Sequence, residues 1–421
     1  MNPQLGLPVK LFQGRWGMKT SGTGQCLVWH LTHTDLRVDF RIQKAMDATQ
    51  SPATRVIGIS FGSHAGYQAK DANGIELLGF VVPPGPREIV NDGKCLNGNS
   101  IIRLEVASKR LNLAQKMLTI PYATLKLLRL RKQSHPIGIY VHDFPLLLPG
   151  VIVSLVTGAK LIYDAHELNG HATGQTGLWS SLILFGQRLS WRHIDGFVTV
   201  SESIRDWFLA QYGPKKAIVI TNSPMSVPSK SSTGREPPLR EKFGLDDDHV
   251  IFCYLGALEP GRNIDTLLRV FANPDRRSTL VFVGDGSLKD EILLVSESVA
   301  SIRCHDPVVN WKISEILRDV DYGFVLIEPV SLSYRLSLPN KLFEYLDSGV
   351  RPIGSKLPEI ARIIDEAGYG FTVDPGERAI EATIKEIEGT GRPKSRAEIP
   401  AQYCWNNQRS RLHLFLEGIF S

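Results

Sequence analysis

The sequence alternates between short apolar strands and helical segments, first from about residue 26 and again from about residue 250. Strand patterns at Cys26–Leu31 and Thr54–Phe61 flank a helical pattern at about Val38–Thr49. Such alternation predicts a parallel, doubly wound sheet, because parallel strands need a crossover connection that is usually a helix. Two such series in a chain of 421 residues predict two domains.

Composition shifts divide the chain into five segments. The start of the chain is polar and Gly-rich, and a Ser, Pro, Lys and Gly-rich stretch separates the two alternating series. We therefore expect a loose tail at 1–25, a first domain at 26–223, a linker at 224–240, a second domain at 241–404 and a C-terminal helix at 405–421.

Charge and cysteine usage exclude several classes of function. The net charge of +5 is too small to indicate wholesale nucleic-acid binding. Five scattered cysteines without a CxxC pair argue against zinc and disulfide frameworks, and they suit a reducing cytosol. The longest uncharged run, Phe144–Ala159, is too short for a membrane span. It predicts a buried helix of an α/β layer.

Polar residues follow several predicted strands of the first domain, at the edge where ligands of doubly wound sheets bind. His142-Asp143 ends one strand, and Asp164-Ala165-His166-Glu167 ends the next. A lone histidine is usually structural, but His166 precedes a Gly-rich loop and is the stronger candidate. The loop that contains Asp35 and Arg37 lies at the same edge. It either contributes to a site or caps the following helix.

A helical segment at Ser337–Gly349 has both ends marked, with Pro339 in its first turn and Gly349 at its C-terminal cap. Its start offers free backbone N–H groups and the adjacent Lys341, a combination that suits a diphosphate. Glu344, one turn further, could accept both hydroxyls of a ribose. The alternative is an amphipathic helix with an ordinary surface Lys–Glu pair.

The turn Gly256–Asn263 provides a second phosphate-friendly site, since a Gly-rich turn with a cation, Arg262, precedes a helix. Two acidic motifs, Asp246-Asp247-Asp248 and Asp319-x-Asp321, have the residue types of a metal site. Because one lies in a loop and the other directly precedes a strand, we expect no metal at either.

The run Pro339-Asn340-Lys341-x-Phe343-Glu344-Tyr345, with the later Pro358-Glu359, resembles the retaining glycosyltransferases of family 4. The resemblance extends from about Val28 to the C-terminus. It implies the GT-B fold, in which two Rossmann-like domains face each other across a cleft. One departure concerns a first glutamate that relatives often carry, since Leu336 stands in its place.

The resemblance also implies roles for individual residues. The second domain would bind a nucleoside diphosphate sugar and the first domain the acceptor, with no metal or other cofactor. His166 would lie beside the donor sugar, and the acceptor side would include Asp35, Arg37 and His142. Donor-binding positions would be Arg262, Asn263, Val308, Asn340, Lys341 and Glu344.

The stretch Arg103–Lys132 is basic and amphipathic, with a single acidic residue. It is either a helix with a solvated basic face or a patch for anionic lipid headgroups. The apolar segment Leu178–Trp191 would add a membrane contact or belong to the core. We expect a cytoplasmic enzyme, free or peripheral on the inner face of the plasma membrane, that transfers sugar to a glycan or lipid-linked acceptor. The alternatives are a GT-B nucleotide-sugar epimerase and a non-catalytic partner subunit.

Overall fold

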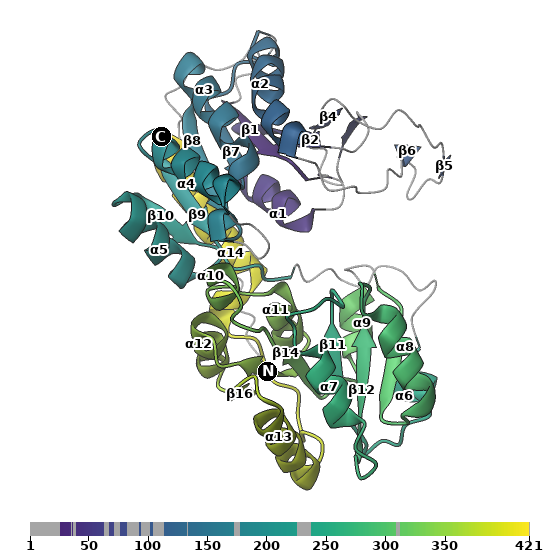
Figure 1. The fold of residues 1–421 in the computed structure, drawn as a ribbon. Helices are drawn as coiled ribbons and strands as arrows, with labels where there is room; N and C mark the ends of the chain where they lie inside the picture. The colour runs from purple at the N-terminus through teal and green to yellow at the C-terminus, as the bar shows by residue number, and fades with distance from the viewer. Residues whose placement is uncertain are drawn as a thin grey trace, which may run out of the picture.

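The computed structural model describes residues 26–34, 36, 39–62, 67–70, 76–81, 92–93, 102–103, 113–132, 134–171, 177–224, 237–308 and 312–420. These residues form two α/β domains, which Figure 1 shows one above the other. The predicted tail, Asp35, Arg37 and most of the predicted linker lie outside the described residues. Two parallel sheets with flanking helices confirm the predicted fold class.

The first domain is built on an eight-stranded sheet in the order β10-β9-β8-β7-β1-β2-β4-β3, in which only β3 runs antiparallel to its neighbour. Its strands are β1 (Cys26–Thr32), β2 (Thr54–Gly62), β3 (Tyr67–Lys70), β4 (Glu76–Val81), β7 (Gly138–His142), β8 (Lys160–Ala165), β9 (Gly196–Thr199) and β10 (Ala217–Val219). The two-residue strands β5 (Asp92–Gly93) and β6 (Ile102–Arg103) pair separately. The chain leaves β1 in one direction and returns to its other side at β7. The carboxyl ends of β1 and β7 are therefore the switch point, where such sheets bind ligands.

Helices cover both faces of this sheet. One face carries α2 (Leu113–Leu130), α3 (Leu147–Thr157), α4 (Leu178–Trp191) and α5 (Glu202–Tyr212). The other face carries α1 (Phe40–Thr49) and α14 (Trp405–Phe420), and α14 inserts Leu412, Leu416 and Phe420 among strand residues such as Tyr140. The C-terminal helix thus returns to the first domain (Figure 1).

The basic helix α2 runs as one helix across Pro121. One local expectation for the first domain was wrong. The uncharged run that begins at Phe144 is not a wholly buried helix. A short 3-10 turn, η1 (Phe144–Leu146), leads into α3, and α3 buries Val151 and Val153 but exposes Ile152, Leu155 and Val156. None of the described helices is both long enough and apolar enough to cross a bilayer.

The second domain has a six-stranded, wholly parallel sheet in the order β13-β12-β11-β14-β15-β16. Its strands are β11 (Val250–Leu255), β12 (Ser278–Val283), β13 (Ile302–His305), β14 (Tyr322–Val325), β15 (Arg351–Ser355) and β16 (Phe371–Val373). The helices are α6 (Leu239–Phe243), α7 (Ile264–Phe271), α8 (Lys289–Ser298), α9 (Ile313–Leu317), α10 (Leu332–Arg335), α11 (Asn340–Asp347), α12 (Pro358–Ala367) and α13 (Glu377–Thr390). The start of α6 falls two residues inside the predicted linker.

The sequence predicted Pro339 inside the first turn of α11, but the helix begins one residue after it, whereas its end agrees with the prediction. Pro339 is the N-cap, and Gly349 follows the helix with a φ of +68°, a conformation that glycine adopts without steric cost. The buried Tyr345 anchors the helix to β11, because its hydroxyl donates to the carbonyl of Cys253 at 3.0 Å and accepts from the N–H of Leu255 at 2.9 Å. These bonds hold α11 against the carboxyl-terminal half of β11.

Polar contacts join the two domains close to these sheet edges. Glu359 on α12 accepts from the backbone N–H and the hydroxyl of Ser203 on α5, at 2.8 and 2.7 Å. The side-chain amide of Asn222 donates to Asn340 Oδ1 at 2.6 Å. The junction therefore connects the segment after β10 with the first residue of α11.

The acidic motif before β14 is used in structural ion pairs. Asp321 accepts from the N–H of Ile251 at 3.0 Å and pairs with Arg240 and Arg392 at 3.2 and 3.1 Å. Its carboxylate thereby ties β11, α6 and the segment after α13 together, at the edge opposite the candidate site.

Candidate functional site

Asp143 directly follows β7 and has a backbone conformation that is rare for a residue with a side chain. Its φ is 60°, and Asp143 and Asn263 are the two non-glycine residues with positive φ in the described part of the chain. Such conformations cost on the order of 1–3 kcal/mol and persist where surrounding contacts hold them. Here Asp143 Oδ1 accepts from the N–H of His166 at 3.0 Å and from Asn169 Nδ2 at 3.2 Å. Both contacts lie at the carboxyl end of β8.

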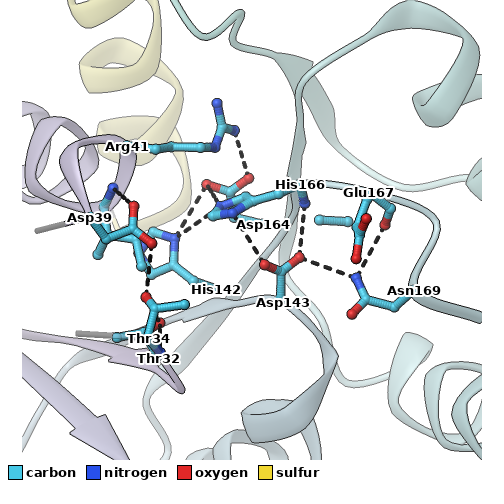
Figure 2. Close-up of polar contacts among 12 residues, drawn as sticks. Thr32, Thr34, Asp39, Arg41, His142, Asp143, Asp164, His166, Glu167 and Asn169 are labelled. Atoms are coloured by element: carbon cyan, nitrogen blue, oxygen red, sulfur yellow. Dashed lines mark hydrogen bonds and ion pairs between the residues drawn. The ribbon is translucent and has the colours of Figure 1, made fainter. Parts of the chain in front are cut away.

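His166 lies between two carboxylates, as Figure 2 shows. Its Nδ1 is 3.1 Å from Asp143 Oδ2, and its Nε2 is 3.5 Å from Asp164 Oδ2. Burial alone would lower the pKa of His166, but Asp143 and Asp164 outweigh it and raise the pKa to about 10. The imidazole is therefore an imidazolium at neutral pH. It can donate hydrogen bonds and stabilise negative charge, but it cannot accept a proton.

A row of buried side chains continues from His166 into the first domain. His166 Nε2 is 3.4 Å from His142 Nδ1, His142 Nε2 is 3.1 Å from His30 Nδ1, and His30 Nε2 is 3.0 Å from the Thr49 hydroxyl. Burial lowers the pKa of both His30 and His142, so both rings are neutral. We call these four residues the histidine row.

The protons of the histidine row can be assigned from its partners. His142 Nδ1 lies 3.4 Å from His166 Nε2 and 3.5 Å from Asp164 Oδ2. Because His166 carries hydrogen on both nitrogens, we assign His142 Nδ1 as the acceptor from His166, which avoids two N–H groups facing each other. His142 then donates from Nε2 to His30, and His30 donates from Nε2 to the Thr49 oxygen. The Thr49 hydroxyl donates to the carbonyl of Ala45 at 2.7 Å. Every polar group in the row is then satisfied.

Arg41 on α1 completes the charge balance at this edge. Its guanidinium pairs with Asp164 Oδ1 at 2.9 Å and also donates to the carbonyl of Ile220. The Tyr140 hydroxyl donates to Asp164 Oδ2 at 3.0 Å. Burial alone would raise the pKa of Asp164, but Arg41 and His166 hold it well below its usual range. Sequence reasoning did not identify Arg41, although the helix after the Asp35–Arg37 loop begins at this edge.

Three ligand atoms of this cluster have the spacing of a small metal site. His142 Nδ1, His166 Nε2 and Asp164 Oδ2 are 3.4 to 3.5 Å apart in each pair. That triangle would fit a cation with bonds of about 2.0–2.1 Å. However, a metal could bind only after His166 lost its Nε2 proton, which its raised pKa opposes. The spacing alone would suit a metal, but the raised pKa of His166 favours a proton on this ring at neutral pH.

The second domain brings two cations to the carboxyl end of β11. Lys341 is buried, and its ammonium nitrogen lies 3.6 Å from the centroid of the Tyr254 ring. Burial and the nearby Arg262 lower the pKa of Lys341 to about 7. Two cations held together in a partly dry site are arranged to receive an anion. The N-terminus of α11 adds free N–H groups to the same place.

Glu344 lies one turn along α11 on the side that faces the first domain. Burial raises the pKa of its carboxyl, while Lys341 and Lys44 oppose the rise. Lys44 is a buried residue of α1, and its ammonium donates to the carbonyl of Ser223 at 2.7 Å. The electrostatic contact between Lys44 and Glu344 shows that the two sheet edges face each other at the domain junction.

The remaining predicted positions differ in how available they are to a ligand. The amide of Asn263 donates to the carbonyl of Pro375 at 3.1 Å, and its backbone N–H donates to Glu328 at 3.3 Å. Asn263 therefore shapes the turn that presents Arg262. Val308 is half-buried against the core of the second domain. Asn340 is exposed and bonded to Asn222. His142 is fully buried within the histidine row and cannot touch an acceptor directly.

Leu336 stands where a first glutamate was expected, and it serves the domain junction. Its side chain packs against the core of the first domain, and its carbonyl accepts from the Ser201 hydroxyl at 3.3 Å.

Comparisons with known proteins agree with this geometry. Residues 71–223 match the family model described as a glycosyl transferase 4-like domain. No curated protein matches the chain. Sucrose-phosphate synthase from Thermosynechococcus elongatus is 10% identical with a TM-score of 0.66, and the match covers 94% of this chain and 95% of that one.

Two further solved structures resemble the chain over nearly its whole length. HepE from Anabaena, solved with UDP and glucose, is 14% identical with a TM-score of 0.57, covering 94% of this chain and 96% of that one. A Listeria monocytogenes protein assigned as a UDP-N-acetylglucosamine 2-epimerase is 10% identical with a TM-score of 0.59, covering 94% and 97%. The chain therefore shares the two-domain GT-B fold of these structures, and its residues 71–223 are similar to a glycosyl transferase 4-like domain.

Proposed function

We propose that the chain is a retaining glycosyltransferase that moves a sugar from a nucleoside diphosphate sugar to a glycan or lipid-linked acceptor, in surface polysaccharide or glycolipid synthesis. The observation that carries the proposal is a pair of neighbouring cations. Lys341 lies in the first turn of α11, and Arg262, in the turn before α7, is close enough to lower its pKa. A diphosphate would offset the charge crowding that lowers the pKa of Lys341.

Each part of the site has a physical task in this reaction. As the glycosidic bond breaks, negative charge grows on the diphosphate, and Arg262, Lys341 and the N–H groups of α11 stabilise it. His166 is protonated, so it donates a hydrogen bond to the sugar or its leaving oxygen. Its Nε2 contacts with His142 and Asp164 are long, at 3.4 and 3.5 Å, so they orient the ring without holding this N–H in a strong hydrogen bond.

The donor that we propose is a UDP-sugar, because HepE, which shares the fold, was solved with UDP and glucose. Glu344 would accept from the ribose hydroxyls, and backbone groups near Val308 would hold the base. We further propose that the reaction takes place in the cytoplasm and uses no metal, since the cations of the site already supply positive charge at the diphosphate.

The test is calorimetric binding of UDP, followed by turnover with a panel of UDP-sugars. The proposal expects binding that weakens when Lys341 or Arg262 is replaced by alanine. Unchanged binding in both variants would show that the nucleotide lies elsewhere.

Two alternative functions are each favoured by one specific observation. The match to the 2-epimerase favours a donor epimerase, which would convert the sugar into an isomer without an acceptor. Leu336, in place of a polar residue, favours a non-catalytic partner subunit, which would bind UDP-sugar without any turnover. Mass spectrometry and NMR of the products separate these three outcomes.

A further inference from the structure

One helix of the first domain exposes a continuous apolar stripe. On α4, the side chains of Leu178, Leu182, Phe185 and Leu189 are 75, 42, 65 and 47% exposed. They recur at intervals of four, three and four residues, so they lie along a single side of the helix. The opposite side of α4 is already packed in the core through Ile183 and Trp191. This helix is therefore apolar on its solvent side as well as on its core side.

The neighbouring helix also exposes apolar side chains. α3 packs against α4, and it exposes Ile152, Leu155 and Val156. We call these seven exposed side chains of α3 and α4 the α3–α4 face. Surface leucines are ordinary when they occur singly, but seven exposed apolar side chains on two packed helices favour a surface that contacts something apolar.

The charged side chains on α4 and directly after it are basic. Arg188 on α4 and Arg192 just beyond it are both exposed, and neither α3 nor α4 contains a carboxylate. α2 packs against α3, also lacks a carboxylate, and exposes Arg129 near its end. Lys160 does not add to this charge, because it pairs with Asp195 at 3.0 Å.

Resting on the function proposed above, we propose that the α3–α4 face docks on an anionic lipid bilayer, and that the acceptor is held in that bilayer. Apolar side chains on the outer side of a helix enter the boundary between headgroups and acyl chains, while basic residues beside them attract anionic headgroups. Arg188 is exposed on α4 between Phe185 and Leu189, and Arg192 is exposed directly after the helix.

The α3–α4 face adjoins the candidate site. After His166 the chain forms a short 3-10 turn, η2 (Asn169–His171), and α4 packs against this turn. The Ser180 hydroxyl near the start of α4 donates to the carbonyl of Gly170. The exposed Leu178 therefore lies near the sheet edge that holds His166. A bilayer that contacts α4 would present its headgroup region to that edge.

Charge also distinguishes a bilayer from a second copy of the chain. A symmetric dimer through the α3–α4 face would bring two basic borders together, with no carboxylate on α2, α3 or α4 to pair with them. An anionic lipid surface is complementary to the same borders.

The experiment is co-sedimentation of the full chain with phosphatidylcholine vesicles, made with and without phosphatidylglycerol. The docking variant is Leu182→Glu with Phe185→Glu, and the matched control is Leu293→Glu with Leu294→Glu on α8 of the second domain. The two pairs have similar exposures, at 42 and 65% against 41 and 69%. Thermal unfolding and UDP calorimetry of each variant show that the fold and the donor site are intact.

We expect the wild type and the control to bind the anionic vesicles, and the docking variant to bind about tenfold or more weakly. Binding of wild type to these vesicles should fall with added salt. Equal sedimentation of the docking variant, or equal binding to both vesicle types, would overturn the proposal. A wild-type dimer that the docking variant makes monomeric, without vesicle binding, would assign the face to a second copy. None of these outcomes depends on UDP binding, so the proposed function is tested separately.

Discussion

The ammonium of Lys341 lies over the ring of Tyr254, with 3.6 Å between the nitrogen and the ring centroid. The ring face stabilises the cation, but burial and Arg262 destabilise it more, and the pKa of Lys341 falls to about 7. The other charged or titratable groups that act on Lys341 are Glu344 and Cys253. At neutral pH this lysine is therefore only partly protonated when no anion is bound beside it.

The first prediction is that nucleotide binding takes up a proton. A diphosphate raises the pKa of Lys341 above about 7, so affinity is highest below this pH and weakens as the pH rises above it, by up to about tenfold per unit. Calorimetry of UDP binding at pH 8, in buffers of different ionisation enthalpy, measures the uptake. Lys341→Met serves as the control, because it should bind more weakly and lose this pH dependence. A wild type with no proton uptake would show that Lys341 is not at the diphosphate.

A second prediction concerns the strength of the two cations. Replacing Arg262 or Lys341 by alanine removes a charge-assisted contact, and each change should weaken UDP binding by about 1.5–3 kcal/mol. Lys385→Ala is the matched control, since Lys385 is an exposed lysine of α13 that pairs with Glu381 on the same helix. Equal effects of all three substitutions would point to general electrostatic attraction instead of a defined pocket.

Local signals explain why the second domain was predictable. Pro339 and Gly349 mark the ends of α11 by their backbone preferences, which do not depend on distant residues. The alternating pattern likewise predicted both parallel sheets. The burial of Lys341 was not predictable, because it arises from Tyr254, which is nearly ninety positions away in the sequence.

A third prediction separates turnover from binding at His166. Its imidazolium lies at the edge of the first domain, whereas the nucleotide is held by the second. His166→Ala should lower kcat by on the order of 10²-fold or more, the scale of losing a positioned donor, while UDP affinity stays near that of wild type. Steady-state rates beside UDP calorimetry test this. Turnover at the wild-type rate would reduce His166 to a structural residue.

A fourth prediction assigns His30 as a positioning residue for His166. His30 accepts from His142, which in turn accepts from His166, so the row fixes the orientation of the imidazolium. His30→Leu should lower kcat about tenfold or more with little change in UDP affinity. His30→Gln should restore part of the loss, because an amide can both accept from His142 and donate to Thr49. If both variants lower only thermal stability, the row is structural.

The fifth prediction concerns metal. A metal at His142, Asp164 and His166 would have to displace the Nε2 proton of His166, which the raised pKa of His166 opposes, so a chelator should leave turnover unchanged. The measurement is the rate of UDP release with and without EDTA. A loss of rate that added zinc restores would contradict the assignment of a protonated His166.

The part of the site that lies in the first domain was only partly predictable from the sequence, because its contacts join segments that are far apart in the chain. Asp143 and Asp164 stood in the predicted strand ends, but Arg41 pairs with Asp164 across 123 positions of sequence. His30 lies inside β1 and carries no local signal. The sequence also did not predict that α3 has an exposed side. An uncharged run has the same residue pattern whether the helix it forms is buried on one face or on both. Only the position of α3 at the outside of the sheet decides between them.

The central claim is sugar transfer from a UDP-sugar, and the most direct test is UDP release from a panel of UDP-sugars, with the sugar product identified by NMR. The account predicts UDP release with at least one sugar, a product with the anomeric configuration of the donor, and strongly reduced release in His166→Ala. A sugar isomer formed without UDP release, or tight UDP-sugar binding without turnover on any offered acceptor, would contradict it.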